Sequence, residues 1–152
     1  MHTRNIFSLL SGLIFTLLFS LSTYADSPSS IPVPSVWENQ SGSTLQINSL
    51  GSDGLITGTY VNHAAGYGCQ SISYPVTGWV YGTALTFNTL WESAAESCNS
   101  ITAWAGFLYQ GQISTLWNLT INGSSSTSQI IQGSDTFKQI QTVTNKSLLL
   151  KK

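Results

Sequence analysis

The chain has 152 residues, the size of one domain with a substantial core. Charged residues make up only 7% of it, against roughly 25% in ordinary soluble domains. With five Lys and Arg in total and a formal net charge of −1, it lacks the basic patch that binding to nucleic acid or to an anionic membrane requires.

The N-terminus has the pattern of a secretory signal peptide. Arg4 precedes an uncharged apolar run over residues 6–21, and Thr23 and Ala25 are small residues at the positions that a signal peptidase reads. The run is short for a membrane helix, and no later stretch is apolar enough for one. We therefore expect cleavage after Ala25, so that residues 1–25 are removed and the mature protein is secreted or periplasmic.

Short β-runs follow a leader that is predicted to be flexible, because residues 26–35 are rich in Ser and Pro. We expect strands at 37–48, 55–62, 74–81, 84–91, 101–108, 113–121, 129–132 and 134–141. Turn residues such as Gly51-Ser52-Asp53-Gly54 and Asn122-Gly123 separate them. This order predicts an all-β domain over 36–141, an eight-stranded antiparallel up-and-down barrel, followed by a peripheral tail over 142–152. Such a barrel is either filled by side chains or holds one small ligand.

Two cysteines, Cys69 and Cys98, lie beyond the signal peptide. A chain bound for an oxidising compartment is expected to pair them in a single disulfide. The alternative is a pair of inert buried thiols. In the chain-entropy model, a bridge lowers the conformational entropy of the denatured state and so stabilises the fold by roughly 3–4 kcal/mol.

Alternate residues on these strands form unusual inward faces. Because successive side chains point to opposite sides of a strand, Ser100, Thr102 and Trp104 share one face. Trp91, Trp104 and Trp117 fall on three consecutive predicted strands. A single Trp on such a face is usually ordinary core, and strand hydroxyls often bond only to neighbouring backbone. Three indoles accompanied by uncharged hydroxyl and amide groups instead favour an apolar pocket with a few orienting polar groups.

The sequence offers little for catalysis. Outside the signal peptide His63 is the one histidine, and it falls in a predicted loop without a nucleophile motif beside it. Metal-ligand spacing and phosphate-binding loops are absent from the sequence. Asp135 is a lone carboxylate, which suits binding better than turnover. We therefore predict a protein that is not an enzyme, with no cofactor and no metal site.

Five short motifs carry a resemblance to a known family. They are WENQSGST at 37–44, ITGTY at 56–60, SITAWAG at 100–106, ISTLW at 113–117 and GSDTF at 133–137. In this order, they resemble the avidins over most of the mature chain. The resemblance implies an avidin-like barrel that captures biotin with high affinity, so that biotin is a ligand and not a cofactor. The alternative is a lipocalin-like barrel for another small apolar molecule.

The resemblance also implies a role for each matching residue. Asn39, Ser43 and Tyr60 would donate to the ureido oxygen of biotin, and Asn62 and Asp135 would accept from its ureido nitrogens. Thr102 would face the thioether sulfur. The valerate carboxylate would be held by Ser100 and by the backbone around Ala64 and Ala65. The walls around the bicyclic ring would be Phe87, Trp91, Trp104 and Trp117.

One departure from most tetrameric avidins concerns quaternary structure. Those avidins carry a further Trp before the last strand, where this chain has Ser126-Thr127-Ser128. The Cys69 and Cys98 pair instead matches the dimeric, rhizavidin-like bacterial avidins. The resemblance therefore implies a homodimer in which the bridge pre-orders the pocket wall, as a partner's Trp does elsewhere.

Overall fold

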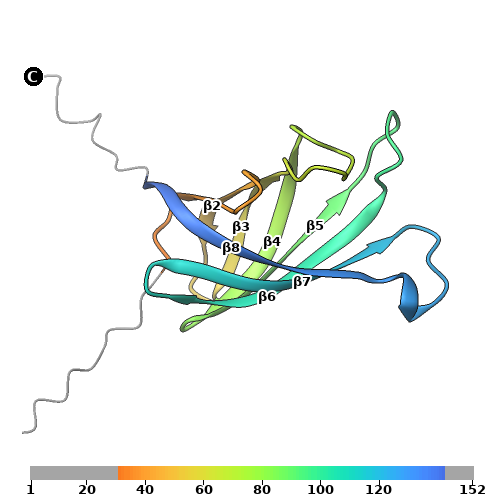
Figure 1. Ribbon diagram of the computed structural model, residues 1–152. Helices are drawn as coiled ribbons and strands as arrows, with labels where there is room; N and C mark the ends of the chain where they lie inside the picture. The colour runs from red at the N-terminus through yellow and green to blue at the C-terminus, as the bar shows by residue number, and fades with distance from the viewer. Residues whose placement is uncertain (1–30, 143–152) are drawn as a thin grey trace, which may run out of the picture.

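Residues 31–142 of the computed structural model are described here, and they form a closed barrel of eight antiparallel strands in chain order (Figure 1). The strands are β1 (Ser35–Glu38), β2 (Thr44–Leu50), β3 (Leu55–Val61), β4 (Ser73–Tyr81), β5 (Ala84–Trp91), β6 (Ser100–Tyr109), β7 (Gln112–Ile121) and β8 (Ile131–Thr142). The predicted signal peptide, residues 26–30 of the leader and residues 143–152 of the tail lie outside the described residues. The predicted barrel fold is confirmed.

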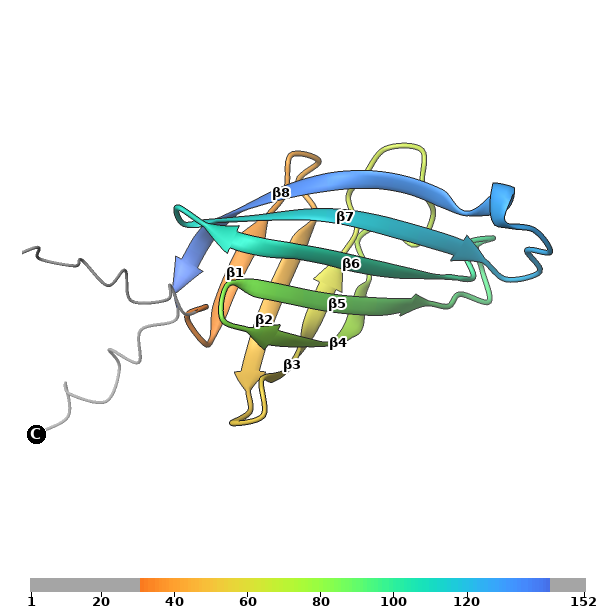
Figure 2. The same cartoon turned by 90° about the horizontal axis from the view of Figure 1, so that it is seen from below.

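The first and last strands close the barrel. β1 pairs with β2 on one side and with β8 on the other, where Glu38 lies opposite Lys138. The longest strands, β6, β7 and β8, run side by side along one wall (Figure 2). Within residues 31–142 no helix has the length and apolar character to cross a membrane.

Two strand boundaries differ from the prediction, although the number of strands agrees. The expected strand 37–48 is broken by a turn in which Asn39 Oδ1 accepts from the backbone N–H groups of Ser41 and Ser43, while Gly42 adopts φ +77°. Such local side-chain bonds compete with a continuous ladder. Conversely, the expected strands 129–132 and 134–141 give one strand, β8, because Gly133 stays in register opposite Trp117. Residue 129 belongs instead to a short 3₁₀ helix, η1 (Thr127–Gln129).

The N-terminal boundary of the ordered barrel also lies earlier than expected. Ile31 is buried in the core, and Ser35 already pairs with Ile47 of β2. The Ser35 hydroxyl accepts a 2.8 Å hydrogen bond from Trp37 Nε1, which ties the start of β1 to the interior. Ile31 and Ser35, at the end of the predicted leader, are therefore packed against the barrel, whereas Val33 between them is exposed.

The hydrophobic core fills one half of the barrel. Its members come from the inward positions of the strands and are almost fully buried: Trp37, Leu45, Ile47, Ile56, Leu85, Phe87, Leu108, Ile113 and Phe137. The other half lies beneath the loops 39–43, 62–72, 92–99 and 122–130, which connect alternate strand pairs at the same end. Because side chains close only one end, the opposite end can hold a ligand.

Candidate functional site

A cavity of about 370 Å³ opens at the loop end of the barrel. Its lining combines polar residues from the loops after β1 and β3 and from β3, β6 and β8 with indoles from β5, β6 and β7 and aliphatic side chains from β7 and β8. Most of the predicted binding residues line it: Asn39, Ser43, Tyr60, Asn62, Ala64, Trp91, Ser100, Thr102, Trp104, Trp117 and Asp135. The structure thus brings together residues that are up to 96 positions apart in sequence.

The polar end of the cavity is built around Asn39 and Asp135. Asn39 Nδ2 donates to Asp135 Oδ1 at 3.0 Å and to the Tyr60 hydroxyl oxygen at 3.3 Å. All three residues are buried, with exposures of 3–8%. Since Oδ1 of Asn39 is held by the 39–43 turn, its amide nitrogen is fixed in direction. Donor and acceptor groups therefore converge in a fixed geometry at the buried end of the cavity.

Asp135 accepts from two further side chains that fix its carboxylate. Trp104 Nε1 donates to Oδ2 at 2.9 Å, and Gln40 Nε2 donates to Oδ1 at 2.9 Å. Gln40 is itself anchored, because its Oε1 accepts from the backbone N–H of Thr136. Gln40 was not among the predicted binding residues. Its position inside the WENQSGST motif, next to Asn39, is the signal that could have found it.

The Tyr60 phenol is kept in its protonated form. Burial, and then the negative charge of Asp135, raise the pKa of Tyr60 well above its usual 10.0, and the Ser43 hydroxyl only partly opposes them. A neutral phenol can donate a hydrogen bond, whereas a phenolate cannot. Tyr60 is therefore a permanent donor at the polar end of the cavity.

The loop after β3 folds back over the cavity through Asn62. Its Oδ1 accepts from the backbone N–H of Ala64 at 2.9 Å and from the Ser43 hydroxyl at 3.4 Å. Its Nδ2 donates to the Gly68 carbonyl at 3.1 Å. His63 lies exposed on the rim, with Nδ1 2.8 Å from the Gly42 carbonyl oxygen. Ser43 and Asn62 thus connect the polar end to the loop above it.

Aromatic rings form the walls of the cavity. The Tyr60 and Trp104 rings stack at 4.9 Å between centroids, and Trp91 meets Tyr60 edge-on at 5.7 Å. The Trp91 indole is oriented by a 2.8 Å hydrogen bond from its Nε1 to the Thr102 hydroxyl. Trp117 is half-buried on β7 and meets Tyr67 of the 62–72 loop edge-on at 6.4 Å. These rings enclose a slot that suits a flat apolar ligand.

Two predicted binding residues, one expected in the wall and one expected near the carboxylate, do not line the cavity. Phe87 lies directly opposite Trp104 in the ladder and stacks behind it at 4.8 Å, so the indole separates it from the cavity. Ala65 is exposed at the outer side of the 62–70 loop. Alternation identifies an inward side chain, but it does not tell how deep in the barrel that side chain lies.

Several lining residues were not predicted as binding residues. They are Gln40, Ser41, Gly66, Tyr67, Gly68, Ser97, Cys98, Leu119, Ile121, Ile131 and Ser134. Leu119 and Ile121 follow Trp117 at alternate positions of β7, so strand periodicity could have found them. The loop residues carry no comparable signal, because their placement depends on the disulfide and on Asn62.

Gly133 lets the Trp117 ring lie directly on β8. A Cβ added at Gly133 would stand 2.2 Å from Trp117 Cζ2, which is far inside van der Waals contact. We expect Gly133→Ala to push the indole into or away from the cavity and to destabilise the fold by about 1–3 kcal/mol. A shift in Trp emission and an altered ligand affinity would reveal it, whereas Gln132→Ala, at the neighbouring outward position, should change neither. Unchanged emission in Gly133→Ala would contradict this role.

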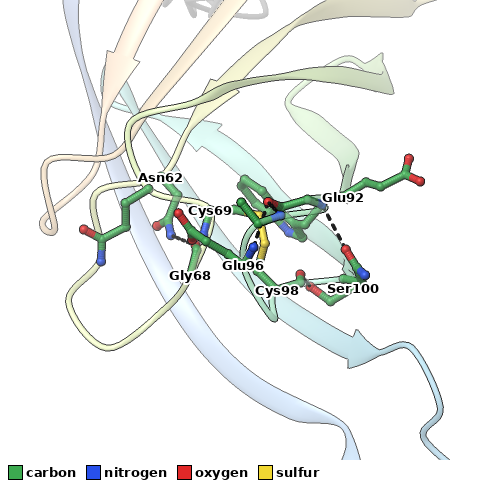
Figure 3. Close-up of a disulfide and its surroundings, with 12 residues drawn as sticks. Asn62, Gly68, Cys69, Glu92, Glu96, Cys98 and Ser100 are labelled. Atoms are coloured by element: carbon green, nitrogen blue, oxygen red, sulfur yellow. Dashed lines mark hydrogen bonds between the residues drawn. A yellow bond between two sulfur atoms is a disulfide. The ribbon is translucent and has the colours of Figure 1, made fainter.

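A disulfide joins the two loops at the mouth of the cavity. Cys69, which is fully buried, is bonded to Cys98 just before β6, as the sequence predicted (Figure 3). Glu96 adds a second connection, since its Oε2 accepts from the backbone N–H of Cys69 at 2.5 Å. Gly68 and Cys98 themselves line the cavity. The bridge therefore fixes one side of the mouth.

The comparisons with known proteins agree with this geometry. A family model described as the avidin family matches residues 27–140. The chain belongs to the avidin family. This avidin is 42% identical over 120 residues to afifavidin of Afifella pfennigii, covering 76% of this chain and 72% of that protein. The resemblance found from the five motifs is confirmed.

Solved structures of other avidins are similar over nearly their whole length. The crystal structure of apo shwanavidin shares 56% identity at a TM-score of 0.69, covering 73% of this chain and 98% of that one. The rhizavidin–biotin complex shares 45% identity at a TM-score of 0.61, covering 70% and 98%. The similarity to rhizavidin that the cysteine pair implied is therefore also a similarity of fold.

Proposed function

We propose that this avidin is an exported, non-enzymatic protein that captures biotin in its barrel cavity. The observation that most strongly supports this function is the cluster of Asn39, Ser43 and Tyr60 at one end, with the Asp135 carboxylate 3.0 Å from the Asn39 amide nitrogen. Rhizavidin, which shares this fold, has been solved as a biotin complex.

The polar cluster suits a cyclic urea. Asn39, Ser43 and Tyr60 donate to the ureido oxygen, which draws electron density onto it and makes the urea N–H groups better donors. Asp135 and Asn62 accept from those N–H groups, and a charged acceptor gives the stronger hydrogen bond. A ligand without the urea would leave buried groups unpaired, at about 1–3 kcal/mol each, which makes the site selective.

The remaining lining residues fit the other parts of biotin. Trp91, Trp104 and Trp117 enclose the bicyclic ring, and Thr102 faces its sulfur. The valeryl chain then runs past Ser100 towards the mouth, beside the loop that carries Ala64. The rings and donors are held by their own contacts, so little ordering remains to be done when the ligand arrives.

Isothermal titration of the mature protein with biotin tests this function. We expect a saturable heat at one site per chain and far weaker binding of a biotin analogue that lacks the ureido oxygen. The same affinity for both ligands would instead favour a barrel for small apolar molecules in the lipocalin manner. Absence of binding would refute the proposal.

The raised pKa of Tyr60 predicts how the protein responds to alkali. The folded state holds the phenolic proton more tightly than the unfolded state, so the resulting stability is complete below pH 10.0 and is lost as the pH rises above that value. We expect Tyr60→Phe and the wild type to show equal tyrosinate absorbance through about pH 9–11, because Tyr60 does not ionise there. A smaller amplitude in Tyr60→Phe would show that the phenol titrates normally.

The protein is proposed to act as a homodimer. Outward positions of β5, β6 and β7 carry exposed apolar side chains, with Leu90 directly opposite Ile101, and Leu116 opposite Ala105. Leu90, Ile101, Phe107 and Leu116 are each more than half exposed, at 51–70%. Adjacent exposed apolar groups of this kind favour burial against a partner. Light scattering should give twice the mass of the mature chain, and a monomer mass at micromolar concentration would refute the dimer.

Export is proposed from the N-terminal sequence, with cleavage after Ala25. N-terminal sequencing of protein recovered from the medium or periplasm tests the position of the cut.

The proposal that the protein is not an enzyme rests on the cavity itself: its one carboxylate, Asp135, is engaged by Asn39, Gln40 and Trp104. Recovery of unaltered biotin from the saturated protein is the expected result.

A further inference from the structure

We propose that His63 is a positioning residue of the biotin site and that it acts through Ser43. This inference rests on the proposed function, in which the Ser43 hydroxyl donates to the ureido oxygen. His63 does not line the cavity. It contacts the 39–43 turn twice, once through its ring and once through its backbone.

Both contacts lie just beyond the end of a β-ladder. The pairing of β2 with β3 ends where Thr44 lies opposite Val61. The next residue, Asn62, pairs instead with Gln70 of its own loop. His63 therefore supplies, through side-chain contacts, a connection to the 39–43 turn that the ladder does not provide.

The ring contact assigns the tautomer of His63. Nδ1 lies 2.8 Å from the Gly42 carbonyl oxygen, and a carbonyl oxygen can only accept a hydrogen bond. Nδ1 therefore carries the proton, and in the neutral ring Nε2 carries none. This bond ties the exposed imidazole to the residue directly before Ser43.

The backbone contact acts on Ser43 itself. The His63 N–H donates to Ser43 Oγ at 2.9 Å and so occupies one lone pair of that oxygen. Hydrogen bonds in a chain polarise one another, so a hydroxyl that accepts from an N–H becomes a better donor. The ring contact to Gly42 keeps this N–H directed at Ser43, because it fixes residue 63 beside the turn.

The Ser43 proton remains available to a ligand. In the structure it is directed at Asn62 Oδ1 over a long contact of 3.4 Å. That oxygen also accepts from the Ala64 N–H at 2.9 Å, so it keeps a partner when the hydroxyl turns away. The hydroxyl can therefore turn to a ureido oxygen at small cost, while the His63 N–H holds its oxygen in place.

A double-mutant cycle on the dissociation rate of biotin tests this inference. The proteins are the wild type, His63→Ala, Ser43→Ala and His63→Ala/Ser43→Ala, each shown to be folded by circular dichroism. We expect His63→Ala to speed dissociation about three- to tenfold, the effect of one hydrogen bond. In the Ser43→Ala background the same change should speed it by less than about twofold, because the group through which His63 acts is gone.

Two further single variants isolate the ring contact. His63→Asn places Nδ2 where Nδ1 of the ring lies, so it can still donate to the Gly42 carbonyl and should restore the wild-type rate to within about twofold. Ser71→Ala changes an exposed side chain of the same loop and should leave the rate unchanged. A His63→Asn protein that releases biotin as fast as His63→Ala would overturn the role of the ring contact.

Nitrogen NMR of protein labelled in its histidine rings gives an independent readout. The other histidine of the sequence, His2, lies in the predicted signal peptide, so the mature chain has one ring to observe. We expect a protonated Nδ1 and an unprotonated Nε2 in the neutral ring, with and without biotin. The opposite tautomer would contradict the contact to Gly42.

The remaining outcomes separate this inference from the proposed function. If His63→Ala speeds dissociation by the same factor with and without the Ser43 hydroxyl, or leaves the wild-type rate unchanged, the inference is wrong while biotin capture stands. If the folded wild type does not bind biotin, the proposed function itself fails.

Discussion

Replacing Asp135 by alanine is expected to weaken biotin binding by about 3 kcal/mol or more, roughly a factor of 10². The carboxylate accepts from Asn39 Nδ2, Gln40 Nε2 and Trp104 Nε1. Its loss removes the charged acceptor for a urea N–H and frees three donors, two of them on the buried residues Asn39 and Trp104, to reorient. Titration of the purified variant with biotin, together with its circular dichroism spectrum, measures the effect.

Two further variants isolate the role of the charge in this result. Asp135→Asn keeps the shape and one acceptor oxygen, so its loss of affinity should be intermediate. Thr136→Ala changes the next side chain on β8, which points outward, and should bind as the wild type does. An Asp135→Ala protein that is folded and binds biotin normally would show that the polar end of the cavity is not the urea site.

Removing the disulfide is expected to lower the free energy of unfolding by about 3–4 kcal/mol. Cys69 and Cys98 are separated by 29 positions, and the chain-entropy model gives this value for a closed loop of that length. The double variant Cys69→Ser/Cys98→Ser should also release biotin faster, because the loop carrying Tyr67 and Gly68 loses its covalent anchor. Denaturant titration without biotin measures the first effect, and stopped-flow chase measures the second.

Reductant supplies the control for the disulfide prediction. It should destabilise the wild type to the level of the double variant and leave the double variant unaffected. The Glu96 contact to the Cys69 N–H remains in both cases, so the loop should keep part of its order. Equal unfolding free energies for the oxidised wild type and the double variant would mean that the bridge does not hold the wall.

Much of the inward face could be predicted from the sequence because alternation is a local property. On β5, β6 and β7 the predicted strands match the observed ones closely, and Trp91, Thr102 and Trp104 point inward as expected. The limits of this reasoning appear at Phe87. It has the same alternation as Trp91, yet it lies behind Trp104 and outside the cavity.

The positions of turns were predicted less well where a hydrogen bond or the size of one side chain determines whether the strand is interrupted. The break between β1 and β2 depends on Asn39 Oδ1 accepting two backbone N–H groups, and the region reads as one continuous strand without that bond. At Gly133 the error was the opposite one, because a strand break was predicted where the strand is continuous. It resembles a strand break, but its missing Cβ makes room for Trp117 within a continuous β8.

The sequence by itself predicted an all-β chain and the inward side of β5, β6 and β7, because strand alternation and turn residues are properties of neighbours along the chain. It also predicted the disulfide, because it contains two cysteines behind the pattern of an export signal. Only the tertiary structure decided that Gln40 fixes Asp135, that Phe87 lies behind an indole, and that the donors at the mouth are already engaged. The Gln40–Asp135 contact depends on the pairing of β1 with β8 that closes the barrel, and the Phe87–Trp104 contact depends on the register of β5 against β6. The donors at the mouth depend on loop conformation. The closing pairing of β1 with β8 carries no local signal, since it is the sum of all eight registers around the ring.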